Sequence, residues 1–176
     1  VYWPSFVAGA AEPGSPQQQT AIVHTILALA SSTVPAFIFS SLLNEKRQFR
    51  AVDIQNATLA GGVAIGTVAN MAIQPVGAVA VGCVASIVST YGFNVIQPKL
   101  EALGVHDTCG IHNLHAMPSI VGAICSIIAC AITAGDDEKL QENSLWQTDN
   151  TKSADQWWRQ LVGMFAVLAF AIITGL

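Results

Sequence analysis

Charged side chains are scarce in this chain of 176 residues, of which only 10% are Asp, Glu, Lys or Arg. Soluble domains carry about 25% charged residues, so this chain has too few to cover a water-facing surface. Hydrophobic residues make up 52% of the sequence and the mean hydropathy is +0.52. We therefore expect a protein whose surface faces lipid.

Other absences narrow the function further. The formal net charge of −4 provides no basic surface for nucleic acid. The four cysteines form no CxxC pair, and most lie in apolar stretches where a free thiol behaves as a small hydrophobe. No basic segment typical of a signal peptide opens the chain. Because Val1 stands where an initiator Met is expected, we interpret the chain as a fragment.

Long apolar stretches dominate what is present. A membrane-spanning helix needs ~20 mostly apolar residues. Five stretches meet that length, and residues 1–11 have the character of the end of a sixth. The five predicted spans are 20–43, 51–73, 76–96, 111–134 and 157–176. The predicted fold class is therefore all-α, a polytopic bundle of membrane helices.

Basic residues predict the orientation of these spans. The loop 44–50 holds three of the seven Lys and Arg residues, and the loop 97–110 on the same side holds Lys99. The opposite side carries the acidic loop 135–156. Because Lys and Arg concentrate in cytoplasmic loops, we expect loop 44–50 in the cytoplasm and loop 135–156 outside.

His115 is the first candidate for a functional residue. The sequence DTCGIHNLHAMP at 107–118 runs directly into the apolar stretch 119–134, so this imidazole lies near or inside the membrane. An ionisable side chain at that depth is costly and marks a functional site by default. A pore-lining imidazole is one interpretation; a helix-end histidine bonded to a backbone carbonyl is the other.

A metal site is the less favoured interpretation of the same region. His106, Cys109, His112 and His115 recur at every third residue, but Gly110 is expected to precede the helix, so the four need not share a face. The sequence offers no second ligand cluster of the kind that zinc sites show. We expect neither a metal nor another cofactor, and we assign His24 a packing or interface role.

Three further side chains are candidates at the ends of the spans. Asp53 falls in the first turn of its helix, where a carboxylate favours the helix dipole, and a role in a pore vestibule is compatible with that position. Trp3 and Phe6 form an aromatic pair at the end of the partial span 1–11. They serve as core or interface aromatics, or as a hydrophobic gate over a pore.

Three collinear motifs resemble the Rhesus (Rh) glycoproteins of the ammonium transporter superfamily. They are WPSF at 3–6, DIQNATLAGGVAIGT at 53–67 and DTCGIHNLH at 107–115. The resemblance covers essentially the whole chain, is poorest in 135–156, and corresponds to the second half of the family's protein. It implies the second of two inverted repeats, each of about five helices, a design known in transporters.

The resemblance also implies a function and its residues. It implies a trimer, or an Rh-family hetero-oligomer, with one ammonia-conducting pore per subunit in the plasma membrane, and carbon dioxide as a further candidate substrate. His115 matches one of two mid-pore histidines, and Phe6 one of two phenylalanines over the outer mouth, supported by Trp3. His112 and Asn113 fall where the family usually has two asparagines at the inner vestibule, and His112 departs from that pattern.

Two alternatives to a conducting pore follow from the same residues. Some Rh-family members are scaffolds without pore histidines, so a non-conducting scaffold or ammonium sensor is the runner-up. A channel for another small solute is the second alternative. An enzyme is not expected, because the sequence shows no nucleophile–base pair, phosphate-binding loop or metal cluster.

Overall fold

The computed structural model describes residues 2–133 and 155–175, and every regular element within them is helical. The all-α class predicted from the sequence is confirmed. In chain order the elements are α1 (Trp3–Ala8), α2 (Pro16–Leu43), α3 (Ala51–Ile65), α4 (Gln74–Tyr91), the π-helix η1 (Gly92–Ile96), α5 (Gln97–Ala102), the π-helix η2 (His112–Ala116), α6 (Met117–Thr133) and α8 (Gln156–Gly175).

Four helical stretches are long and apolar enough to cross a membrane. They are Pro16–Leu43, Gln74–Ala102, His112–Thr133 and Gln156–Gly175. The predicted span 51–73 is helical only over the 15 residues of α3, which at 1.5 Å per residue reach roughly 22 Å, short of a bilayer core of about 30 Å. After Ile65 the chain continues in short turns that return Val68 and Met71 to the buried core.

Local sequence accounts for the helix starts. Ser15 caps α2 by accepting a hydrogen bond from the backbone N–H of Gln18 at 3.2 Å, and Pro16 follows, where a missing N–H costs nothing. Pro75 likewise lies in the first turn of α4. Gly110 has φ +66° immediately before the η2–α6 helix. This left-handed conformation suits glycine and turns the chain into that helix.

Helices α2, α3 and α4 form the packed core, and small residues set their separation. A Cβ added to Gly61 would lie 2.5 Å from the carbonyl oxygen of Ala28, and one added to Gly82 would meet the same carbonyl group. Gly122 of α6 approaches the Ala64 carbonyl of α3 in the same way. Close backbone approach of this kind is how membrane helices gain packing energy without a hydrophobic driving force.

Pro35 lies inside α2 and leaves one carbonyl group without its helical partner. A proline has no N–H, so residue 35 cannot donate to the carbonyl oxygen of Ser31. The thiol of Cys83 on α4 takes that place, with its sulfur 3.6 Å from the Ser31 oxygen. An inter-helix contact thus replaces a hydrogen bond that α2 lost.

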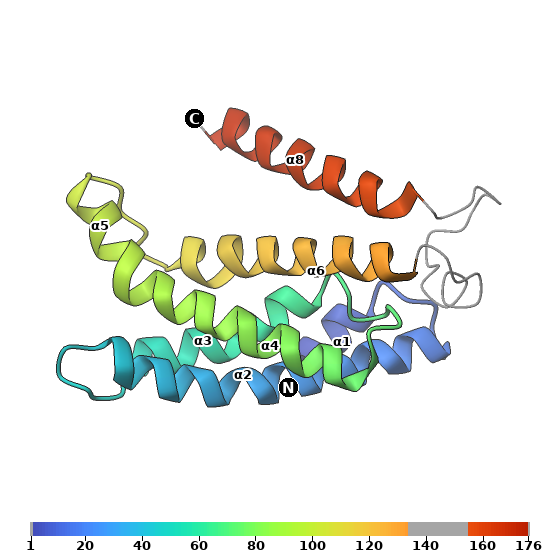
Figure 1. The fold of residues 1–176 in the computed structure, drawn as a ribbon, viewed down its shortest axis with the longest axis horizontal. Helices are drawn as coiled ribbons and strands as arrows, with labels where there is room; N and C mark the ends of the chain where they lie inside the picture. The colour runs from blue at the N-terminus through green and yellow to red at the C-terminus, as the bar shows by residue number, and fades with distance from the viewer. Residues whose placement is uncertain (1, 134–154, 176) are drawn as a thin grey trace.

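The connections gather at two ends of the bundle (Figure 1). The α2–α3 connection and α5 lie at one end, and the α3–α4 connection, α1 and the start of α8 lie toward the other. The two loops that hold Lys46 and Lys99 therefore share one end, as the alternation of spans predicts. Helix α8 packs along α6 and contains no buried residue, so its apolar surface faces outward.

Candidate functional site

His115 lies in the π-helix η2, at the start of the helix that continues as α6. Its side chain is exposed, and it has no hydrogen-bond partner among the residues that the structure describes. The bond to a neighbouring backbone carbonyl that the structural interpretation required is not made in this part of the chain. Single π-helical turns inside longer helices occur frequently at functional sites.

Asp107 fixes the start of the helix that carries His115. Its Oδ1 accepts from the backbone N–H of Ile111 at 2.9 Å, and its Oδ2 accepts from that of His112 at 2.8 Å. These are the N–H groups of a first turn, which have no partner within the helix. No role for Asp107 was predicted from the sequence, although an Asp shortly before a predicted helix is a recognised capping signal.

His112 and Asn113 belong to a chain of side-chain hydrogen bonds. The Nδ1 of His112 lies 3.0 Å from Oδ1 of Asn113, whose Nδ2 donates to Oε1 of Gln97 at 3.0 Å. Gln97 in turn donates from Nε2 to Oε1 of Glu101 at 3.0 Å. Asn113 is only 1% exposed. The predicted vestibule pair is thus bonded side by side, and it is oriented by two residues of α5, Gln97 and Glu101, that were not predicted from the sequence.

The crossing of η1 and η2 brings this chain together. A Cβ added to Gly92 would lie 2.6 Å from Oδ1 of Asn113, so only glycine allows that approach. Gly110 lies against the ring of Phe93 in the same crossing. Two π-helical segments, one from each of two candidate spans, therefore meet next to the motif that carries His115.

Trp3 and Phe6 occupy different environments although both are on α1. Trp3 packs on α3, where a Cβ added to Gly62 would lie 2.6 Å from its Nε1. Phe6 is 82% exposed. Trp3 therefore holds α1 against α3, whereas the Phe6 side chain is left exposed by the described residues. In Figure 1, α1 lies toward the end opposite α5, so Phe6 and the His112–Ala116 segment are not in one cluster.

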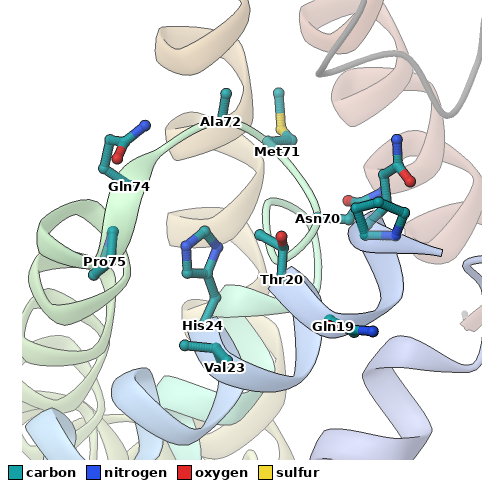
Figure 2. A pocket seen from close by; sticks show the side chains of 11 residues that line it. Gln19, Thr20, Val23, His24, Asn70, Met71, Ala72, Gln74 and Pro75 are labelled. Carbon is teal, nitrogen blue, oxygen red and sulfur yellow. The ribbon is translucent and has the colours of Figure 1, made fainter. Parts of the chain in front are cut away.

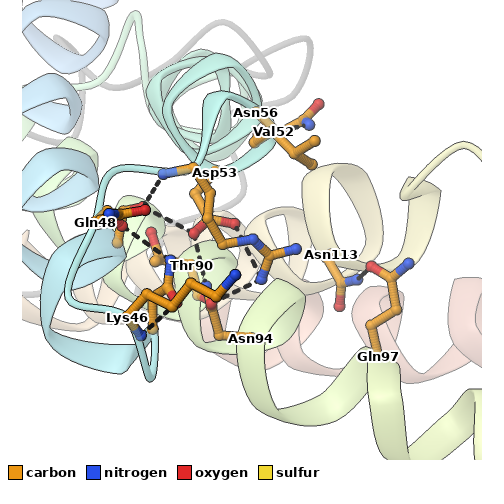
Figure 3. Close-up of polar contacts among 12 residues, drawn as sticks. Lys46, Gln48, Val52, Asp53, Asn56, Thr90, Asn94, Gln97 and Asn113 are labelled. Atoms are coloured by element: carbon orange, nitrogen blue, oxygen red, sulfur yellow. Dashed lines mark hydrogen bonds and ion pairs between the residues drawn. The ribbon is translucent and has the colours of Figure 1, made fainter.

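Asp53 is completely buried and anchors a polar cluster at the end of the bundle that holds loop 44–50 (Figure 3). Its Oδ2 accepts from Ser40 Oγ at 2.9 Å and from Asn94 Nδ2 at 2.9 Å. Ser40, Asp53 and Asn94 belong to α2, α3 and η1. The carboxylate thus joins three elements through side chains.

Arg50 closes the same cluster from the loop. Its Nη1 donates to Asn94 Oδ1 at 2.8 Å and lies 3.9 Å from Asp53 Oδ1, and its backbone N–H donates to Ser40 Oγ at 3.0 Å. Asp53 Oδ1 has no hydrogen-bond partner in the described part of the chain. Its charge is compensated at longer range by the guanidinium, as a buried carboxylate requires. The polar partners of Asp53 among the described residues are Ser40, Asn94 and Arg50, and no hydrogen bond or ion pair joins it to His112 or Asn113.

His24 lies in a pocket of about 450 Å³ between the start of α2 and the α3–α4 connection (Figure 2). The imidazole is 4% exposed, and its Nδ1 lies 2.8 Å from the carbonyl oxygen of Ala69. Because a carbonyl oxygen only accepts, Nδ1 carries the proton. The bond joins α2 to a connection without regular structure, which confirms the predicted packing role of His24.

The described residues contain no group of three or more His, Cys, Asp or Glu side chains arranged to hold a metal ion. Cys109 and His106 are both exposed in the connection between α5 and η2. Residues 135–154 of the acidic loop 135–156 lie outside the described residues, and so does the prediction that they face the outside of the membrane.

Comparison with known proteins supplies the family context. The model of the Ammonium Transporter Family matches residues 1–176. Ammonium transporter Rh type B of Danio rerio is 40% identical over 179 residues, covering 100% of this chain and 38% of that protein. Ammonium transporter Rh type C of Xenopus laevis is 42% identical, with coverages of 99% and 38%.

A solved structure agrees with these sequence relationships. The structure of Nitrosomonas europaea Rh50, from the Rhesus protein family of channels, superposes with a TM-score of 0.66 at 30% identity. The match covers 99% of this chain and 52% of that one. The chain thus spans about two fifths of the length of the curated relatives and about half of the solved channel.

Proposed function

This chain belongs to the ammonium transporter family, as an Rh-type member, and from that membership we propose that it forms the second repeat of an ammonia-conducting channel. The family is one of membrane transporters, not of enzymes. Because the chain spans 38% of its curated relatives, the remaining pore wall is proposed to come from a longer polypeptide. We refer to that polypeptide as the full-length transporter, and we propose that it assembles as a trimer or Rh-family hetero-oligomer with one pore per subunit.

The unpartnered imidazole of His115 is the observation that supports this proposal most strongly. It lies in a π-helical turn at the start of a candidate span, with the backbone there fixed by Asp107. A neutral imidazole donates from one nitrogen and accepts at the other. It therefore suits a narrow path in which ammonia must exchange hydrogen bonds as it moves.

Desolvation favours neutral ammonia as the species that crosses. Moving ammonium into a dry pore costs several kcal/mol unless the charge is compensated. Ammonia carries no such charge. We propose that ammonium gives up or shares its proton at the outer vestibule and that ammonia passes His115. Carbon dioxide is a further candidate, because a neutral molecule faces the same low barrier.

The remaining predicted residues take roles at the two ends of this path. Phe6, held in place through Trp3 and Gly62, is proposed as part of the outer hydrophobic gate. His112 and Asn113 are proposed to line the inner vestibule. Asp53 is proposed to serve the same end by holding Arg50 and Asn94 in position.

The orientation follows from the distribution of charge. Loop 44–50 and α5 share one end of the bundle, and their Lys and Arg residues favour the cytoplasmic side. We propose that this end is cytoplasmic, that residues 135–156 are extracellular, and that the protein resides in the plasma membrane. Trp157 and Trp158 then lie near the outer interface, where amphipathic aromatics concentrate.

Stopped-flow alkalinisation of proteoliposomes tests the proposal against the scaffold alternative. Full-length transporter trimers are reconstituted, an inward ammonia gradient is imposed, and internal pH is followed with a trapped dye. A channel accelerates alkalinisation above that of empty liposomes. An unaccelerated signal, with trimers verified in the same vesicles, would favour the non-conducting scaffold or sensor.

A further inference from the structure

We propose that Glu101 and Gln97 are positioning residues that set the tautomer of His112 through Asn113, so that its Nε2 faces the inner mouth as a hydrogen-bond acceptor. One part of this inference rests on the proposed function: that Nε2 of His112 accepts a hydrogen bond from an N–H of the conducted ammonia or ammonium. The tautomer itself does not depend on conduction.

The direction of the hydrogen-bond chain begins at Glu101. An ionised carboxylate only accepts, so Gln97 presents its Nε2 to Glu101 Oε1, 3.0 Å away. The other end of the same amide is then Oε1, which accepts from Asn113 Nδ2 at 3.0 Å. Each amide has one donor end and one acceptor end. The orientation of the first amide therefore fixes that of the second.

The chain ends on the imidazole of His112. With its Nδ2 committed to Gln97, Asn113 offers only Oδ1 to His112 Nδ1, at 3.0 Å. A carbonyl oxygen cannot donate, so Nδ1 carries the proton. The neutral ring then has its lone pair on Nε2. The exposed carboxylate of Glu101 thereby selects the form of a ring two amides away.

The reverse direction is disfavoured at the Glu101 end of the hydrogen-bond chain, and so is a reversal of one amide alone. If both amides turned over, Gln97 would place its oxygen against the carboxylate of Glu101, and two acceptors would face each other. If the amide of Asn113 turned over alone, its Nδ2 would leave Gln97, and water could not replace that lost bond because Asn113 is 1% exposed. The close approach at Gly92 holds Asn113 within this crossing. Within His112, Asp107 accepts a hydrogen bond from the backbone N–H only, so the tautomer of the His112 ring is set by its bond to Asn113.

The lone pair on Nε2 is suited to an N–H donor. Ammonia that has crossed the pore, or ammonium re-formed at the inner side, can donate to Nε2. The other tautomer would present an N–H, which meets the N–H groups of ammonium unfavourably. His112 thus adds an acceptor at a position where a carboxamide side chain would offer both a donor and an acceptor.

Nitrogen-15 NMR of histidine-labelled full-length transporter tests the chain directly. Spectra are taken at an alkaline pH at which imidazole is neutral, and the His112 signals are identified by their loss in His112→Gln. Glu101→Lys is the informative variant, because an ammonium donates and should reverse both amides. Glu45→Lys is the matched control: it makes the same charge change on the same side, and Glu45 has no hydrogen-bond or ion-pair partner among the described residues.

The expected result is a protonated Nδ1 in the wild type and in Glu45→Lys, and a protonated Nε2 in Glu101→Lys. Gln97→Leu, which interrupts the chain, should give a mixture of both tautomers and keeps the test decisive if the lysine variant fails to assemble. The proposed hydrogen-bond chain would be wrong if the wild-type His112 ring were protonated at Nε2. It would also be wrong if Glu101→Lys and Glu45→Lys had the same His112 tautomer.

Ammonia flux of the same proteins separates the tautomer from its use. We expect flux in Glu101→Lys to be roughly threefold to tenfold lower than in Glu45→Lys, the range that one hydrogen bond represents. Equal flux with a reversed tautomer would overturn the acceptor role. If the wild type had the predicted tautomer but gave alkalinisation no faster than empty liposomes, the proposed function would be wrong. The hydrogen-bond chain from Glu101 to His112 would still stand.

Discussion

The carboxylate of Asp107 accepts a hydrogen bond from the backbone N–H of His112 at 2.8 Å and so fixes the first turn of the helix that carries His115. Its second oxygen takes the N–H of Ile111 at 2.9 Å. A single side chain therefore fixes both the start of the helix and the direction in which the proposed pore residue extends. If His115 lines a pore as proposed, Asp107 matters for conduction although it need not touch the substrate.

Replacing Asp107 tests that relationship. Asp107→Ala should lower the free energy of unfolding by about 1–2 kcal/mol, because two first-turn N–H groups lose a charged acceptor. It should also reduce ammonia flux, because the position of His115 is no longer fixed. Asp107→Asn keeps one acceptor oxygen and should fall between alanine and the wild type. Thermal unfolding in detergent and stopped-flow flux measure the two effects; wild-type values of both in the alanine variant would contradict the assignment.

The cluster around Asp53 predicts strong coupling between side chains of different helices. Asp53→Ala should lower the free energy of unfolding by about 2–4 kcal/mol, because Ser40, Asn94 and Arg50 all lose the same buried partner. In a double-mutant cycle with Asn94→Ala, the coupling energy should exceed about 0.5 kcal/mol, the limit for independent sites. Additive losses would mean that the Asp53–Asn94 bond contributes little.

Glycines at helix contacts predict a position-dependent effect of adding a side chain. Gly82→Val should prevent close packing of α4 on α2 and cost about 3 kcal/mol or more, because its Cβ meets the carbonyl group of Ala28. Gly163→Val on α8 is the control, since a Cβ there meets no atom within 4 Å. The measurement is the fraction of full-length transporter that elutes as folded protein in the proposed trimeric state. Equal yields of the two variants would contradict the packing described here.

His24 predicts a loss of stability without a loss of conduction. His24→Ala removes the donor to the Ala69 carbonyl and leaves that oxygen in a partly enclosed pocket. The expected cost is about 1–3 kcal/mol of unfolding free energy. Flux per folded trimer should be unchanged, because the imidazole is committed to packing. A flux deficit that persists after normalisation to folded protein would instead give His24 a part in the path.

The positions of the main helices could be predicted because each leaves a signal in the linear sequence. Apolar length located α2, α4, α6 and α8, because each of these helices leaves a long apolar stretch in the sequence. The end of α3 at Ile65 could not be predicted, because residues 66–73 are as apolar as a helix but form turns that bury Val68, Ala69 and Met71. Apolar character measures burial, and a buried turn has the same composition as a buried helix.

The candidate site was predictable only in part, for a related reason. The cost of an ionisable group in lipid identifies His115 from its position alone. The partners of His112 and Asn113 are separated from them in sequence, and only the crossing of η1 and η2 brings Gln97 close to Asn113. Likewise, the sequence position of Asp53 predicted only a favourable interaction with the helix dipole, whereas its carboxylate accepts hydrogen bonds from side chains of α2 and η1. Contacts of that kind require the fold.

Ammonia flux through full-length transporter carrying His115→Ala, compared with the wild type and with His24→Ala, is the decisive measurement for the proposed pore. Both variants remove an imidazole, but only one removes the exposed ring of η2. A pore lined by His115 predicts that His115→Ala loses most of the accelerated alkalinisation while its assembly and thermal stability stay near wild type. His24→Ala should keep its flux per folded protein. Unchanged flux and selectivity in His115→Ala would contradict the pore assigned to this residue.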